Sequence, residues 1–104
     1  MSGKITIKYL QEYIKSKDHH PDLINTYFLK LTEEVGELSR AIRKNLRPGD
    51  ESQIKETIEE ELWDVVYYII TLANCYDIDF EEAIRKKEEL NNERYHTGLQ
   101  FDPQ

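Results

Sequence analysis

The stretch that most limits what this chain can fold into covers residues 59–73 and reads EEELWDVVYYIITLA. It contains no glycine or proline, and at roughly 100° per residue it carries apolar side chains on almost every side. One apolar wall comprises Leu62, Val65, Ile69, Leu72 and Tyr76. The opposite wall comprises Trp63, Tyr67 and Ile70. A helix that is apolar on both sides needs neighbours on both sides, so we predict an all-α protein with this helix at its centre.

Two carboxylates interrupt this apolar helix. Glu61 and Asp64 stand one turn apart, on the flank between the two walls. Removing such carboxylates from water costs several kcal/mol per ion unless cations or hydrogen-bond donors meet them. The pair therefore predicts a bound counter-charge.

Length and charge narrow the class of protein. A chain of 104 residues suits a single domain, residues 1–104, with a modest core that oligomerisation would complete. The net charge of −7 argues against binding of nucleic acid or of an anionic membrane, because both need a basic face. The single cysteine, Cys75, excludes an intrachain disulfide, and no apolar run approaches the roughly 18 residues of a membrane span. The N-terminal segment lacks the apolar core of a signal peptide, so we expect a cytoplasmic protein.

Further helices are predicted on both sides of the central one. Periodicity indicates a short amphipathic helix over residues 6–17 and a long one over about 23–45. The loop 47–50 should end the long helix, Asp50 or Ser52 should cap the central helix, and the central helix should run to about Tyr76. Asp79 and Glu82 form a capping-box pattern that opens a last helix. The predicted core covers about residues 21–95, and residues 96–104 form a tail.

The two long helices repeat one local pattern. Residues 33–38, EEVGEL, align with residues 60–65, EELWDV, so that acidic positions coincide and share the flank of an apolar face. If a short loop makes the two helices antiparallel, four carboxylates can converge: Glu34, Glu37, Glu61 and Asp64. Four carboxylates cannot share one space without counter-charge. Magnesium, a hard cation with oxygen ligands, is the predicted occupant.

The last helix changes character along one line. Its stripe begins with Phe80 and Ile84 and continues as Lys87, Asn91 and Arg94. Two cations and an amide at steps of four and three residues suit phosphate oxygens, with arginine as a bidentate fork. The alternative is that these basic residues only compensate the helix dipole.

Over residues 29–95 the chain resembles the MazG-like, all-α nucleoside triphosphate pyrophosphohydrolases, including single-domain relatives of the dCTP pyrophosphatase type. The resemblance is carried by an ExxE motif at Glu34 and Glu37, an ExxD motif at Glu61 and Asp64, and the run from Lys87 to Tyr95. It implies a four- to five-helix bundle that assembles as a homo-oligomer, a dimer or a tetramer. It also implies magnesium-dependent cleavage of a nucleoside triphosphate between the α and β phosphates, with manganese as a substitute metal and house-cleaning of the nucleotide pool as the role.

Within this resemblance the roles divide by residue type. Glu34, Glu37, Glu61 and Asp64 would hold the metal, and Lys87, Asn91 and Arg94 would hold the phosphates. Either Glu33 or Glu37 would orient or deprotonate the attacking water. The base is expected to meet groups of the early helices, and no motif assigns them.

Two other classes remain open at the level of sequence. A di-iron or di-manganese carboxylate bundle typically needs Glu-x-x-His on two helices, and this chain does not carry that motif on two long helices. A non-enzymatic helical interaction module would use the apolar faces as an oligomer interface and the carboxylates as surface charge.

The central helix also predicts an oligomer interface. The wall of Trp63, Tyr67 and Ile70, with Asn74 at its end, is expected to pack on a second copy. The alternative is that the first helix folds back and covers this wall within one subunit.

Overall fold

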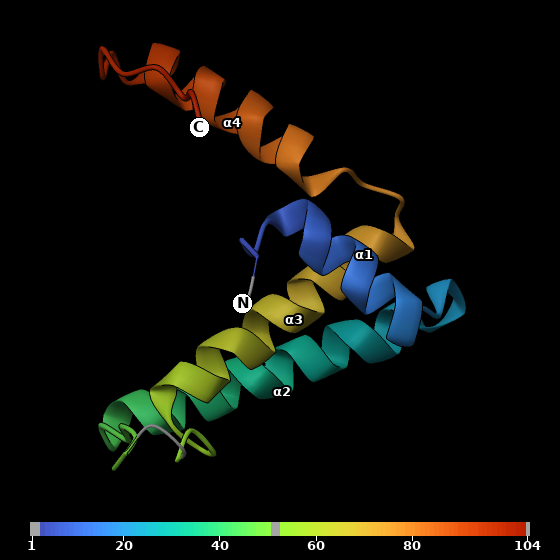
Figure 1. Cartoon of the computed structure of the whole chain (residues 1–104), viewed down its shortest axis with the longest axis vertical. Coiled ribbons are helices and arrows are strands. Elements are labelled where there is room, and N and C mark those ends of the chain that lie inside the picture. The colour runs from blue at the N-terminus through green and yellow to red at the C-terminus, as the bar shows by residue number, and fades with distance from the viewer. Residues whose placement is uncertain (1–2, 51–52, 104) are drawn as a thin grey trace.

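The computed structural model describes residues 3–50 and 53–103, and its helices follow one another around a central antiparallel pair (Figure 1). The elements are α1 (Ile7–Lys17), a 3-10 turn η1 (Pro21–Leu23), α2 (Ile24–Arg43), α3 (Ile58–Cys75) and α4 (Phe80–Arg94). No strand occurs within the described ranges. The predicted all-α fold and its two long helices are confirmed.

The pair formed by α2 and α3 is the centre of the molecule. Tyr27 and Ala41 of α2 are buried, as are Glu61 and Thr71 of α3. At the closed end of the pair, the Ile58 N–H donates to the Leu46 carbonyl at 2.8 Å. An ion pair between the Arg47 guanidinium and the Glu59 carboxylate ties the loop to the first turn of α3.

Side-chain caps begin α1, α3 and α4. Thr6, Thr57 and Asp79 accept hydrogen bonds from Tyr9, Glu60 and Glu82 N–H groups, respectively. The cap of α3 differs from the prediction, because Thr57 fills this role and Asp50 lies in the preceding loop. Ser52, the other predicted cap, lies outside the described residues. The prediction of Asp79 as the cap of α4 is confirmed.

Three helices end in the same way. Asn45, Asp77 and His96 follow the C-caps of α2, α3 and α4 with φ values of 51°, 53° and 51°. In each case the next N–H reaches back to a carbonyl in the last turn, as Leu46 does to Ala41 at 2.9 Å. This Schellman arrangement satisfies carbonyls that would otherwise lack donors. Consequently α2 ends at Arg43, two residues before the predicted end and ahead of the loop 47–50.

Helix α1 crosses α3 and covers one of its apolar walls (Figure 1). Ile14 of α1 and Ile70 of α3 are both fully buried. Asn74 Nδ2 donates to the Gln11 carbonyl at 3.0 Å, which fixes the two helices together. The predicted oligomer interface is therefore wrong for Ile70 and Asn74, because the first helix of the same chain covers them, whereas Trp63 of the same wall is 39% exposed.

Part of the opposite side of α3 is exposed, whereas Val65 and Leu72 are half-buried. Leu62, Val66 and Ile69 form a stripe there at steps of four and three residues. On α2, Phe28, Val35 and Ile42 form a second exposed stripe at heptad spacing. We refer to these six residues together as the open apolar face.

The molecule exposes more surface than a compact monomer of its size. Its accessible surface is 8171 Å², against about 6,100 Å² expected for a folded monomer of this mass. Its radius of gyration is 16.2 Å, against about 13 Å for a compact chain of this length. Part of the excess comes from α4, which packs on α1 and diverges from α2 and α3 (Figure 1).

None of the helices in the described ranges combines the length and the apolar character that crossing a membrane requires.

Candidate metal centre

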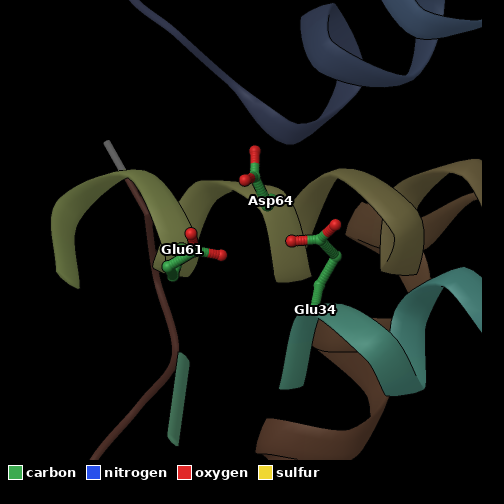
Figure 2. A group of neighbouring side chains, drawn as sticks. All are labelled: Glu34, Glu61 and Asp64. Atoms are coloured by element: carbon green, nitrogen blue, oxygen red, sulfur yellow. The ribbon is translucent and has the colours of Figure 1, made fainter. Parts of the chain in front are cut away.

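Three carboxylates meet between α2 and α3. Glu34 of α2 extends toward Glu61 and Asp64 of α3 (Figure 2). One oxygen atom from each residue lies within 4.8 Å of those of the other two. The helix register produces this meeting, because Glu34 lies on the same side of α2 as the buried Tyr27 and Ala41.

Glu61 of the cluster is shielded from solvent. Glu61 is 7% exposed, and its Oε2 atom has no hydrogen-bond partner. Burial raises the pKa of Glu61 to about 7, with further contributions from a hydrogen bond with Glu34 and from the charges of nearby acids. Burial and the charge of Glu34 also raise the pKa of Asp64. The metal-free cluster therefore retains protons that an isolated carboxylate would release.

The donor set suits a hard divalent cation. All three groups offer carboxylate oxygens, which magnesium and manganese prefer. No lysine, arginine or histidine forms a salt bridge with these residues within the described ranges. The unpartnered Oε2 of Glu61 is the kind of buried atom that a cation would satisfy.

The other predicted acidic residues lie outside the cluster. Glu37 is exposed, one turn beyond Glu34 on α2, and is not among the three converging carboxylates. Glu33 is also exposed, and its Oε2 lies 3.6 Å from the Lys30 ammonium. The structure thus brings together three of the four predicted metal ligands, and Glu37 is not among them.

The predicted phosphate-binding stripe lies on α4, away from the cluster. Lys87 and Arg94 are exposed and Asn91 is half-buried. Asn91 Nδ2 donates to Glu88 Oε2 at 3.1 Å, and the Arg94 guanidinium lies 5.5 Å from the centre of the Tyr95 ring. Because α4 diverges from α2 and α3, the stripe and the carboxylates do not meet within one chain (Figure 1).

The role of Asp18 was not predicted from the sequence. Asp18, the C-cap of α1, accepts hydrogen bonds from the Tyr27 and Tyr67 hydroxyls at 2.8 and 3.0 Å. It therefore links α1 to both central helices. The sequence places Asp18 in a polar break between helices, and no spacing there indicates that two distant tyrosines converge on it.

The chain is similar to known proteins in sequence and in fold. Residues 24–97 match the MazG nucleotide pyrophosphohydrolase domain. A crystal structure of iMazG from Vibrio DAT 722 superposes with a TM-score of 0.79 at 40% identity, covering 85% of this chain and 99% of that one. A second structure of the same protein gives a TM-score of 0.80 at 40% identity, covering 88% and 98%.

Proteins of known sequence are also similar to part of this chain. Uncharacterized protein YpjD of Bacillus subtilis is 41% identical over 56 residues, which are 52% of this chain and 50% of that protein. Rat dCTP pyrophosphatase 1 is 36% identical over 76 residues, 68% of this chain and 45% of that protein. The chain thus spans about half the length of these relatives. Because residues 24–97 make up most of the chain and match this domain, the chain belongs to the MazG nucleotide pyrophosphohydrolase family.

Proposed function

We propose that the protein is a magnesium-dependent nucleoside triphosphate pyrophosphohydrolase, which releases the monophosphate and pyrophosphate. The observation that carries this proposal is the buried cluster of Glu34, Glu61 and Asp64, with one Glu61 oxygen lacking a partner. Membership of the MazG family and the similarity to dCTP pyrophosphatase 1 support the reaction class.

The three clustered carboxylates would hold the cation. When bound, magnesium supplies positive charge that screens the triphosphate and stabilises the leaving pyrophosphate. Glu34, Glu61 and Asp64 lie on two helices that pack closely, and this supports a set of ligands that is held in position before substrate arrives. Manganese shares the preference for oxygen ligands and would substitute.

Glu37 is our candidate for the group that orients and deprotonates the attacking water. It stands one helical turn from Glu34 on α2 and is exposed to solvent. Its carboxylate is therefore not committed to the converging set. Glu33, the other candidate, has the Lys30 ammonium as a neighbour, which competes for its oxygens.

Lys87, Asn91 and Arg94 would hold the outer phosphates, and this requires a second copy of the chain. Within one chain α4 diverges from the carboxylate pair (Figure 1). The open apolar face and the excess of accessible surface favour a homo-oligomer, with the dimer as its smallest form. In such an assembly the stripe of one chain would serve the carboxylates of its partner.

Product analysis tests the proposal. The purified chain should be incubated with each canonical ribo- and deoxynucleoside triphosphate and magnesium, and its products separated. We expect monophosphate and pyrophosphate in equal amounts, and no reaction after chelation of the metal. Release of diphosphate and inorganic phosphate would contradict the reaction, and absence of any turnover would favour a helical interaction module.

A further inference from the structure

Asp18 joins three helices through one carboxylate. Its Oδ1 accepts from the Tyr27 hydroxyl of α2 at 2.8 Å, and its Oδ2 accepts from the Tyr67 hydroxyl of α3 at 3.0 Å. The neighbouring Lys17 places its ammonium 5.2 Å from the centre of the Tyr67 ring. Each oxygen of Asp18 thus accepts a hydrogen bond from a different tyrosine, so one carboxylate restrains both rings.

The two bonded tyrosines hold a third between them. The Tyr68 ring centre lies 5.2 Å from that of Tyr67, at an interplanar angle of 75°. It lies 6.4 Å from that of Tyr27, at 39°. We refer to Tyr27, Tyr67 and Tyr68 as the tyrosine layer.

The tyrosine layer adjoins the carboxylate cluster. Tyr68 follows Asp64 by one helical turn, and Tyr27 precedes Glu34 by two turns on the antiparallel helix. The charges of Glu34 and Asp64 act on the Tyr68 hydroxyl and contribute to raising its pKa, together with the larger effect of burial. The layer therefore borders the cluster on the side that faces α1.

A nucleotide held at the cluster by its phosphates can extend its nucleoside in either direction along the α2–α3 pair. Toward the connecting loop, the next residue on this side of α3 is Thr57, which is buried and bonded to Ile54 and Glu60. Toward α1 lies the tyrosine layer, in which Tyr67 and Tyr68 are only half-buried. Partly exposed aromatic rings offer a nucleoside stacking surface.

We infer that Asp18 is a positioning residue for nucleotide binding: it fixes the tyrosine layer that contacts the nucleoside, without contacting the nucleotide itself. This inference rests on the proposed function and concerns only the nucleoside part of the ligand. It separates two contributions to binding: the phosphates interact with the cation held by Glu34, Glu61 and Asp64, and the nucleoside lies beyond Tyr68.

Calorimetric titration tests the inference with two probes. One is the tightest binder among the α,β-imido analogues of the four deoxynucleoside triphosphates, and the other is inorganic tripolyphosphate, both with magnesium. Asp18→Ala should weaken binding of the analogue by about tenfold and leave that of tripolyphosphate within about twofold, since stacking is lost and phosphate contacts remain. Asp18→Asn keeps one acceptor oxygen and should lose less.

Two further variants refine the design. Tyr67→Phe removes one bond to Asp18 and keeps the ring, so it should show the same selective loss at smaller size. Combined with Asp18→Ala it should add nothing, because the two residues act through one contact. Asp22→Ala removes an exposed carboxylate from the same segment and should change neither affinity.

Each other outcome has a distinct meaning. Equal weakening of both probes by Asp18→Ala would overturn the inference, because Asp18 would then support the fold in general. Unchanged affinity for the analogue would overturn it as well. If Asp18→Ala fails to fold by circular dichroism, Asp18→Asn and Tyr67→Phe decide by the same criterion. Failure of the wild-type chain to bind either probe would instead refute the proposed function, and the inference with it.

Discussion

At the scale of single residues, the structure separates carboxylates that look equivalent in the sequence. Glu34 and Glu37 stand three residues apart on one helix, and both fit the repeat that relates α2 to α3. Only Glu34 converges with Glu61 and Asp64. Spacing places both residues near the flank of the apolar face, whereas the rotation of α2 against α3 decides which one points inward. That rotation is a property of the packed pair and cannot be derived from either helix alone.

Glu61 should link the stability of the metal-free protein to pH. Its folded pKa of about 7 lies above its ordinary 4.5, so the folded state binds the extra proton between these values. The contribution of Glu61 to the unfolding free energy is fully present below pH 4.5 and is lost as the pH rises through about 7. The loss amounts to at most about 3 kcal/mol. Chemical denaturation with chelator should therefore give a lower unfolding free energy at about pH 8 than at about pH 5.

Glu61→Gln should remove most of this pH dependence and be more stable than wild type at about pH 8, by about 1–3 kcal/mol. The same variant should lose turnover by about 100-fold or more, because a ligand of the cation is gone. Glu12→Gln, an exposed position on α1, is the matched control and should change neither quantity. If the metal-free Glu61→Gln variant were less stable than wild type at about pH 8, the raised pKa of Glu61 would be contradicted.

At the scale of helices, periodicity in the sequence predicted the number, order and type of the long elements. The ends were harder, because Asp50, Ser52 and Thr57 are all good capping residues and only tertiary structure selects Thr57. The walls of α3 were exchanged for a related reason. Apolar residues on two sides of a helix predict two partners without stating which partner takes which side. Here α1 packs on the side of α3 that carries Ile70, and Leu62 and Ile69 on the other side remain exposed.

The cap at Thr57 holds the first turn of α3, in which Glu61 lies close to the helix start. Thr57 is 5% exposed and its hydroxyl accepts from the Glu60 N–H. Thr57→Ala should lower the unfolding free energy by about 1–2 kcal/mol, since a helix N–H loses its acceptor in a buried place. Thr57→Ser keeps the hydroxyl and should recover most of the loss. Denaturant titration of both variants measures this, and equal stability of Thr57→Ala and wild type would exclude a capping role.

At the scale of the whole molecule, one chain carries all the residues of the proposed site without bringing them together. The carboxylates converge between α2 and α3, while Lys87 and Arg94 lie on α4, which packs on α1. The open apolar face lies on the same two helices that carry the carboxylates. A second copy that covers this face would also bring a second α4 near the site.

Mixing two inactive variants tests whether partner chains share each site. Glu61→Gln lacks a proposed cation ligand, and Arg94→Ala lacks the guanidinium proposed to bind phosphate. If a site takes Glu61 from one chain and Arg94 from the other, half of the sites in a mixed dimer are intact. Random mixing should then restore about a quarter of wild-type turnover, since half of the dimers are mixed.

Adding Ile69→Lys to both variants should abolish this recovery, because a charge on the open apolar face blocks association. Light scattering should then report monomers. Replacing Arg94→Ala by Lys86→Ala supplies the matched control, since Lys86 lies off the stripe and its variant should be active alone. Absence of any recovery from a mixture that scattering shows to be dimeric would place both groups in one chain.

The most direct test of the account is a magnesium titration of the metal-free protein near pH 7, followed by calorimetry in buffers of different ionisation enthalpy. Because Glu61 holds a proton with a pKa of about 7, binding of the cation should be saturable and should release protons into the buffer. Glu61→Gln should bind more weakly and release fewer protons, and Glu12→Gln should match wild type. Saturable binding that is identical in Glu61→Gln and wild type, or no binding at all, would contradict the assignment of Glu34, Glu61 and Asp64 as the metal centre.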